Sequence, residues 1–270
     1  MATVRIHIDD EPIDVEAGTN LLIALLDAGH ALPHPCFHPA LSAPASCRLC
    51  LVALEGPDST RLITACNRNV DNGQRLSLRD PQLMSARSGL VDDILLRHPA
   101  ECAVCERAGE CEVQEAVAAH GDGTTRATLV GSGERVQLGP RLVLDRSRCI
   151  LCTRCVRFLE EVTDTQELEV FGMGATEILG IRPGVRLDND YSGNVVDLCP
   201  VGALTDKDFR FKRRVWYLKQ TPSICDGCSR GCNVRIDWDL NLFRTHKKFQ
   251  IMQTMRTETT EHQRIQRIKP

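Results

Sequence analysis

The chain has 270 residues, a net charge of −3 and 42% hydrophobic residues, which suits several small globular domains and offers no positive excess for binding nucleic acid. No apolar run approaches the roughly 18 residues of a membrane-spanning helix, and no signal peptide is evident. The sequence holds 14 cysteines but only 4% aromatic residues. Without a signal peptide, so many cysteines favour metal binding over a secreted disulfide framework.

Residues 1–79 are predicted to form a small β-rich domain with one main helix. Apolar and polar residues alternate over 3–16, which predicts a β-hairpin turning at Asp9 and Asp10. The stretch TNLLIALLDAGH predicts a helix with Thr19 as N-cap and Gly29 as its stop. After a loop rich in proline and cysteine, short strands are expected at LVALEG, RLITACN and QRLSLRD.

A second unit is predicted over 80–120 and a third over 140–214. Asp80 followed by Pro81 is a typical helix start, and Pro99 should end that helix. A further helix is expected at EVQEAVAAHG, and the Gly-rich residues 121–144 are interpreted as a linking loop. Residues 215–270 form a fourth segment with a polar tail. The sequence as a whole predicts an α+β fold.

The first set of candidate ligands has the spacing C-x10-C-x2-C-x15-C and comprises Cys36, Cys47, Cys50 and Cys66. The two residues between Cys47 and Cys50 let both thiolates face one site from a tight loop. This is a variant of the plant-type ferredoxin pattern, in which a β-rich fold wraps a loop around a [2Fe–2S] cluster. A zinc site remains the alternative. Arg48 and Arg68 lie beside ligands in the sequence and could offset the charge of a cluster.

The second set has the spacing H-x3-C-x2-C-x5-C and comprises His98, Cys102, Cys105 and Cys111. His98 ends a predicted helix four positions before a C-x2-C pair, which makes it a candidate ligand. One histidine with three cysteines is also a known zinc set, so spacing leaves [4Fe–4S] and zinc both open. An imidazole in place of a thiolate would remove negative charge and should raise the potential of a cluster.

The third set comprises Cys149, Cys152, Cys155 and Cys199. C-x2-C-x2-C is the bacterial ferredoxin run, and a remote cysteine followed by proline completes such clusters. Two residues between ligands suit a cubane, because successive thiolates can reach different iron corners from one short turn. This set predicts a [4Fe–4S] cluster and favours iron for the second set as well.

Three cysteines remain in the stretch CDGCSRGC: Cys225, Cys228 and Cys232. The other eleven cysteines and His98 fill three sets of four, so no cysteine is left to complete a fourth. The natural chain could continue past Pro270, the fourth cluster could be lost, or His246, His262 or a partner subunit could supply a ligand. A further [4Fe–4S] cluster is expected only if a fourth ligand exists.

These sets, in this order, resemble the large iron–sulfur subunit of bacterial respiratory complex I, NADH:quinone oxidoreductase. The stretches CILCTRCVRF, SGNVVDLCPVGALTDKDFRFKRRVW and TPSICDGCSRGCN carry the resemblance, which covers nearly the whole chain. It implies a β-grasp [2Fe–2S] domain, a helical domain with a His-ligated [4Fe–4S] cluster, and a bacterial-ferredoxin-like [4Fe–4S] domain. It also implies that the fourth segment is the start of a molybdopterin-oxidoreductase-like region.

The resemblance further implies an electron-transfer subunit that takes electrons from a flavin-containing, NADH-binding subunit and passes them toward quinone-module subunits. It places the chain in the peripheral arm at the cytoplasmic face of the bacterial inner membrane, with no transmembrane segment and no substrate site of its own. Two alternatives stay open: a diaphorase subunit of a soluble NAD-linked hydrogenase or formate dehydrogenase, and a zinc-stabilised interaction module without a redox role.

Overall fold

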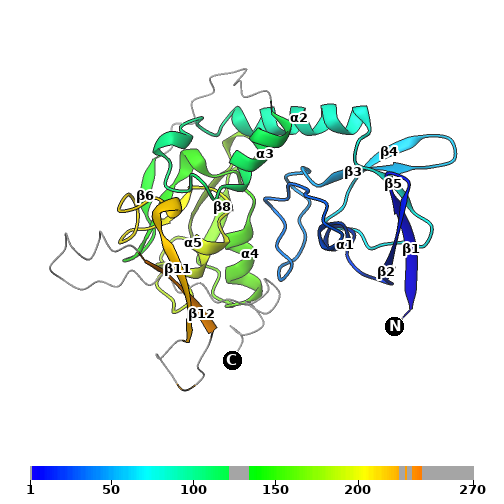
Figure 1. The fold of residues 1–270 in the computed structure, drawn as a ribbon. Helices are drawn as coiled ribbons and strands as arrows, with labels where there is room; N and C mark the ends of the chain where they lie inside the picture. Colours follow the sequence, from blue (N-terminus) through cyan, green and yellow to red (C-terminus); the bar gives the residue numbers. More distant parts are fainter. Residues whose placement is uncertain (1, 122–133, 225–228, 230–232, 239–270) are drawn as a thin grey trace.

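The computed structural model describes residues 2–121, 134–224, 229 and 233–238. The β-rich N-terminal part lies to one side of the molecule, and helix α2 (Pro81–Leu95) runs from it along the rest of the chain (Figure 1). Within the described parts of the chain, no helix is long and apolar enough to cross a membrane. The mixture of helices with separate sheets agrees with the predicted α+β class.

A five-stranded sheet with the order β2-β1-β5-β3-β4 forms the N-terminal part. Its strands are β1 (Thr3–Ile8), β2 (Glu11–Glu16), β3 (Leu51–Glu55), β4 (Thr60–Thr64) and β5 (Arg75–Ser77). Ile8 pairs with Glu11, so the predicted hairpin is confirmed, and both turn residues adopt positive φ as a two-residue hairpin turn requires. The β1–β5 pair is parallel, whereas all the other pairs of this sheet are antiparallel.

Helix α1 (Leu21–Asp27) covers this sheet and begins at Asn20 rather than at the predicted Thr19. The Asn20 side-chain oxygen accepts hydrogen bonds from the backbone N–H groups of Leu22 and Ile23, and asparagine caps at least as well as threonine. Thr19 instead uses its carbonyl oxygen to accept a hydrogen bond from Val70 N. Gly29, at φ +86°, follows the helix as predicted, because this left-handed conformation is strained for residues with a side chain.

Helices α2 and α3 (Glu112–His120) pack against each other beside the N-terminal part. Asp80 caps α2 through hydrogen bonds to the next turn, with Pro81 at the first helical position, and the helix ends ahead of Pro99 as predicted. A short 3-10 helix (Cys102–Val104) lies between α2 and α3. Leu49, Val91, Leu95 and Ala116 form a small apolar cluster that joins the cysteine-bearing loop of the N-terminal part to these helices.

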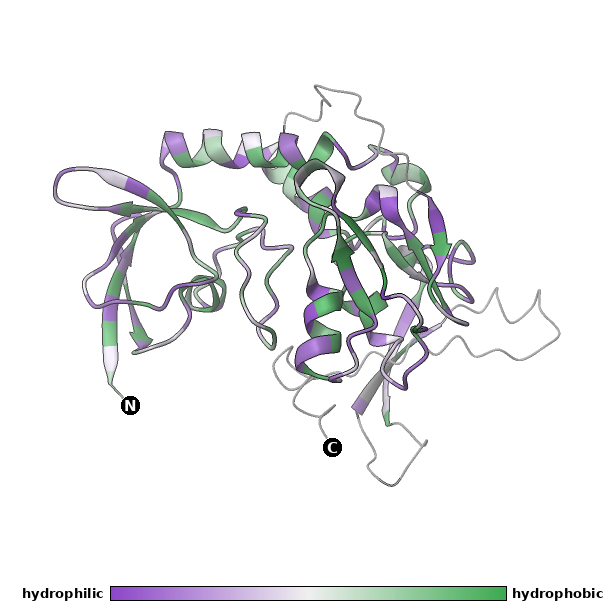
Figure 2. Ribbon diagram, turned by 180° about the vertical axis from the view of Figure 1, so that it is seen from behind, coloured by the Kyte–Doolittle hydropathy of each residue, from purple (hydrophilic) through white to green (hydrophobic). Residues whose placement is uncertain are grey.

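The third part of the chain forms a three-stranded sheet of the order β10-β7-β6 and a separate β8–β9 hairpin. Its elements are β6 (Arg135–Gln137), β7 (Leu142–Asp145), α4 (Arg154–Glu161), β8 (Leu168–Phe171), β9 (Ile178–Ile181), α5 (Asn194–Leu198) and β10 (Leu204–Asp206). Helix α4 carries both charged and apolar residues, and Figure 2 shows that hydrophilic and hydrophobic residues are mixed along the helices and strands of this part. Its core includes Phe158 and Leu159 together with Leu41 from the N-terminal part.

Two strands lie within the stretch 121–144, where we predicted a linking loop. Strand β6 starts before residue 140, yet it pairs with β7 of the third unit. Strand β6 is hard to recognise in the sequence because it has only three residues and Gly139 follows two positions after its end. A Cβ at Gly139 would lie 2.1 Å from the Leu187 carbonyl oxygen, so this turn needs a residue without a side chain.

Beyond the third part, β11 (Lys219–Ile224) pairs antiparallel with β12 (Asn233–Trp238). Cys225, Cys228 and Cys232 lie outside the described residues, as do His246 and His262. Apart from this pair of strands, the interpretation of residues 215–270 as a fourth-cluster segment remains a prediction.

Candidate metal centres

The first set comes together where a long loop meets the ends of β3 and β4. Cys36, Cys50 and Cys66 are buried at 0%, 1% and 0% exposure, and Cys47 is half-buried. Ala45 and Arg48 adopt left-handed backbone conformations on either side of Cys47, which turns the loop sharply around that residue. Asn20, the cap of α1, donates a hydrogen bond of 2.7 Å to the Cys66 carbonyl oxygen.

The thiols of this set are within hydrogen-bonding contact of one another. Contacts with Cys47 and Cys66 lower the pKa of Cys36, and the contact with Cys36 raises the pKa of Cys47. Contact with Cys66 lowers the pKa of Cys50, and contacts with Cys36 and Cys50 raise the pKa of Cys66. These contacts bring the four thiols close to one another, and thiolates are the form that binds metal.

The second set lies between α2 and α3. Cys105 and Cys111 are buried, and Cys102 is exposed at the start of the 3-10 helix. Burial raises the pKa of Cys111 to about 11, and the charges of Cys105 and Cys102 add to this effect because both thiols are close.

His98 is buried at 9% exposure, and its pKa is lowered first by burial and then by the charge of Arg148. The imidazole is therefore held neutral, which is the form that binds metal. Among the described residues, its Nδ1 atom has no hydrogen-bond partner. A buried ring nitrogen in this state fits a ligand role, since buried polar atoms are otherwise paired.

The third set lines one apolar cavity together with Ile150, Leu151, Thr153, Val170, Leu179, Val201, Ala203 and Leu204. All four of its thiols, Cys149, Cys152, Cys155 and Cys199, face this space. Left-handed conformations at Leu151 and Thr153 curl the C-x2-C-x2-C run around it, and Cys155 starts the first turn of α4. Cys199 caps the C-terminal end of α5.

Burial raises the pKa of Cys149 to about 12, and it also raises those of Cys152 and Cys155. These three thiols would be costly to ionise without a nearby cation. A cofactor that carries several iron atoms would supply that positive charge, so the donor set and the apolar walls fit an iron–sulfur cluster.

The cysteines within each set lie near one another, and no disulfide joins any of the eleven described cysteines. In residues 2–121 and 134–224, no three histidine, cysteine, aspartate or glutamate side chains are grouped closely enough to hold a single metal ion. The third set surrounds a shared apolar cavity.

Three family models match successive parts of the chain, and each covers one set. Residues 1–80 match a 2Fe-2S iron-sulfur cluster binding domain, and residues 87–126 match the NADH-ubiquinone oxidoreductase-G iron-sulfur binding region. Residues 139–205 match the ferredoxin-like domain of NADH-quinone oxidoreductase subunit 3. The G subunit of NADH-quinone oxidoreductase from Rickettsia felis is 35% identical over 235 residues, which is 87% of this chain. Over that stretch, the chain is similar to part of a subunit of NADH-quinone oxidoreductase.

The mitochondrial NADH dehydrogenase [ubiquinone] iron-sulfur protein 1 of Solanum tuberosum is also similar, at 37% identity over 87% of the chain. The chain spans about a third of the length of these relatives, 35% of the Rickettsia protein and 32% of the potato protein. A chain of the NAD+-reducing [NiFe]-hydrogenase, solved in its H2-reduced state, matches with a TM-score of 0.71 at 29% identity. That match covers 79% of this chain and 92% of the hydrogenase chain.

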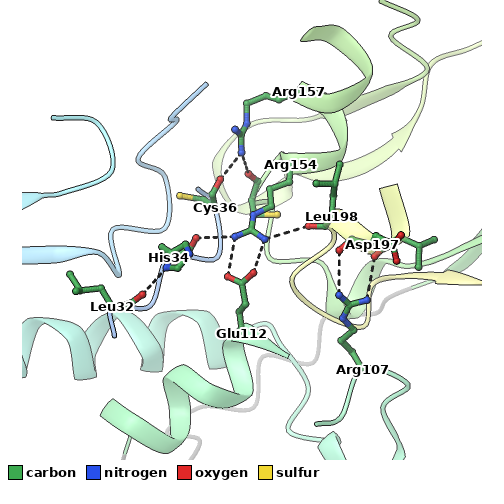
Figure 3. A network of polar contacts seen from close by, with 11 residues as sticks. Leu32, His34, Cys36, Arg107, Glu112, Arg154, Arg157, Asp197 and Leu198 are labelled. Carbon is green, nitrogen blue, oxygen red and sulfur yellow. Dashed lines mark hydrogen bonds and ion pairs between the residues drawn. The ribbon is translucent and has the colours of Figure 1, made fainter. Parts of the chain in front are cut away.

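Arginines that the sequence did not single out connect the three sets of this chain. Arg48 and Arg68, which flank ligands in the sequence, are exposed. Arg154 and Arg157 of α4 are buried and donate hydrogen bonds to the backbone beside the ligands (Figure 3). Arg107 similarly reaches the Val196 and Asp197 carbonyl oxygens at 3.3 and 3.4 Å. The spacing of Arg154 and Arg157 along α4 is helical, but nothing local identifies partners more than a hundred residues away.

Proposed function

We propose that the protein is an electron-transfer subunit of a complex I-type NADH dehydrogenase. The observation that carries this proposal is the apolar cavity lined by all four cysteines of the third set, flanked by two further compact donor sets. Homology to the iron–sulfur region of NADH-quinone oxidoreductase supports the same assignment. In this role the chain takes electrons from a flavin-containing, NADH-oxidising subunit and passes them toward the quinone module.

The ligand roles belong to the same proposal. Cysteines of the first set hold a [2Fe–2S] cluster, His98 and the cysteines of the second set hold a [4Fe–4S] cluster, and the third set holds another. Bound clusters supply reversible one-electron chemistry at potentials that their surroundings adjust. The chain itself supplies the thiolates, the neutral imidazole, the apolar walls that keep water from the third set, and the contacts that hold the sets side by side.

The finer fold assignments are part of this proposal as well: a β-grasp domain over 1–79, a helical domain over 80–120, and a bacterial-ferredoxin-like domain over 140–214. The mixed five-stranded sheet under α1 supports the first of them. We place the chain in the peripheral arm of a membrane complex, on the cytoplasmic face, through its partner subunits.

A second candidate is the diaphorase subunit of an NAD-linked hydrogenase or formate dehydrogenase. The structural likeness to the NAD+-reducing [NiFe]-hydrogenase chain favours it. The two candidates share the cluster chemistry and differ in partners. Affinity purification of the natural complex followed by mass spectrometry separates them, since quinone-module subunits would support the first and hydrogenase or formate dehydrogenase subunits the second.

Anaerobic purification of the full chain tests the electron-transfer assignment itself. We expect a brown protein with about ten iron atoms per chain, two from one [2Fe–2S] and eight from two [4Fe–4S] clusters. Reduction with dithionite should bleach the visible absorbance and produce electron paramagnetic resonance signals. A colourless protein that contains zinc and no iron would overturn the proposal in favour of a zinc-stabilised module.

Cys225, Cys228 and Cys232 are proposed to bind a further [4Fe–4S] cluster only where a fourth ligand is supplied. About fourteen iron atoms per chain, falling to about ten in a variant with all three replaced by alanine, would show that the site is filled. Intact mass spectrometry of the natural protein shows whether its chain is longer than this sequence.

A further inference from the structure

One face of α4 packs its polar side chains against the loop that carries Cys36. Arg154, Arg157 and Glu161 follow at helical spacing of three and four residues, so they lie on the same side of the helix. Arg154 donates to the His34 carbonyl oxygen at 3.0 Å, and Glu161 accepts a hydrogen bond of 2.9 Å from Ser42 N. The helix therefore holds both ends of the segment 34–42.

Arg157 joins this segment to the third set. Its Nη2 atom donates to the carbonyl oxygens of Cys36 at 2.6 Å and Cys152 at 3.2 Å, while Nη1 donates to the Ser42 carbonyl oxygen. Its Nε atom donates to the Thr153 hydroxyl at 3.2 Å. The side chain is buried at 7% exposure, and every nitrogen of the guanidinium has a partner. A single side chain thus bonds the backbone of a first-set ligand and of a third-set ligand.

Arg154 extends the connection to the second set. Besides His34, its guanidinium binds the Glu112 carboxylate through two nitrogens, at 2.6 and 3.0 Å, and contacts the Leu198 carbonyl oxygen at 3.5 Å. Glu112 directly follows Cys111 of the second set, and Leu198 directly precedes Cys199 of the third. Figure 3 shows these contacts converging on Arg154 from three separate segments of the chain.

We propose that Arg154 and Arg157 are positioning residues that fix the ligand-bearing segments of the three sets relative to one another. We further propose that the Arg157 guanidinium provides a positive charge shared by the first and third sets; this second part rests on the proposed function. Both arginines donate hydrogen bonds to backbone carbonyl oxygens at or beside the ligand residues. Their positive charge therefore lies near the sulfur atoms, and no cysteine thiol is used in these hydrogen bonds.

The shape and charge of arginine explain why this residue type occupies the junction. The planar guanidinium group can donate hydrogen bonds to several acceptors at once, whereas lysine has a single ammonium group on a flexible side chain. Since the usual pKa of arginine is far above neutrality, the side chain remains cationic. Its charge is therefore permanent at this junction.

Hydrogen exchange of the full chain, followed by mass spectrometry, tests the positioning role without relying on bound iron. In Arg157→Gln we expect amides of the segment 34–42 to exchange about tenfold faster, with β1–β5 unchanged. Arg157→Lys should show a smaller increase, because lysine restores one donor group. Arg182→Gln is the matched control, since Arg182 bonds Glu169 and Gln166 within the third unit and reaches no ligand segment. Unchanged exchange over 34–42 in Arg157→Gln would overturn the role; if that variant fails to fold, the same comparison is made with Arg157→Lys.

Redox titration tests the shared charge, which a purely structural role would not alter. Arg157→Gln should shift the midpoint potentials of the first-set and third-set signals to more negative values, because loss of a nearby positive charge disfavours the reduced form. Arg157→Lys should restore the midpoint potentials of both sets, while the hydrogen-exchange rate of residues 34–42 should stay above that of the unaltered protein. Intact signals with unchanged potentials in Arg157→Gln would overturn the shared charge. Absence of iron signals in the unaltered protein would instead overturn the proposed function, while the exchange data still decide the positioning role.

Discussion

Gly202 lies directly against the thiol of Cys105. A Cβ atom built on Gly202 would be 2.4 Å from Cys105 Sγ, closer than any real carbon–sulfur contact between side chains. Gly202 belongs to the loop that follows Cys199, whereas Cys105 belongs to the second set. Nearby, Glu112 N donates to the Pro200 carbonyl oxygen at 3.0 Å. The loop that completes the third set therefore also forms one wall of the second.

Gly202→Ala should displace Cys105 and weaken the second set while sparing the first. The added methyl group cannot fit unless either the thiol or the loop moves, and overpacking of this kind typically costs about 1–3 kcal/mol. We expect a loss of up to about four iron atoms per chain and of the second-set resonance signal. Gly193→Ala serves as the control, because a Cβ there meets nothing within 4 Å and the backbone φ of −60° is ordinary. Full iron content in Gly202→Ala would contradict this prediction.

Asn20→Ala should reduce stability and also disturb the first set. The substitution removes the helix cap, at a cost of about 1 kcal/mol, and the hydrogen bond to the Cys66 carbonyl oxygen. Asp80→Ala removes the equivalent cap of α2 without touching a cysteine, so it is the matched control. Urea unfolding should show a loss of stability in both variants, and the loss should be larger in Asn20→Ala because this variant also lacks the hydrogen bond to Cys66. Only Asn20→Ala should alter the first-set signal, and equal effects on that signal would refute a specific link to Cys66.

The features that the sequence predicts well are local ones. The hairpin at 3–16 and the start of α2 at Asp80 both follow from patterns of a few residues. Asn20 and Thr19 show the limit of this reasoning, because both are good caps and the choice depends on pairing between Thr19 and Val70. Local propensity cannot resolve a difference that long-range contacts decide.

The arginines show the same limit at the candidate site. Sequence proximity suggested Arg48 and Arg68 as charges near a cluster, but both side chains are exposed. Arg154 and Arg157 are buried instead, and they reach segments 120 and 121 residues away. Cysteine ligands can be recognised because one short loop must supply several of them, whereas a guanidinium finds its partners only after the units have packed together.

His98→Cys should retain the second cluster and shift its midpoint potential to a more negative value. A thiolate adds a negative charge where the neutral imidazole has none, and this disfavours addition of an electron. The buried, unpaired Nδ1 of His98 supports its role as a ligand. Redox titration monitored by electron paramagnetic resonance measures the change, with His120→Cys as a control on the neighbouring helix α3. An unchanged midpoint would mean that His98 is not a ligand.

Cys199→Ala should abolish the third cluster and leave the [2Fe–2S] signal of the first set intact. Cys199 faces the cavity of the third set from the end of α5, and none of the hydrogen bonds that hold the Cys36 loop to α4 involves its side chain. We expect about four fewer iron atoms per chain. Val201→Ala is the matched control, because Val201 lines the same cavity and is also buried but offers no ligand. It should lose stability and keep its iron. Joint loss of the first-set and third-set signals in Cys199→Ala would show that the two sets assemble as one unit, or that Cys199 has been assigned to the wrong set.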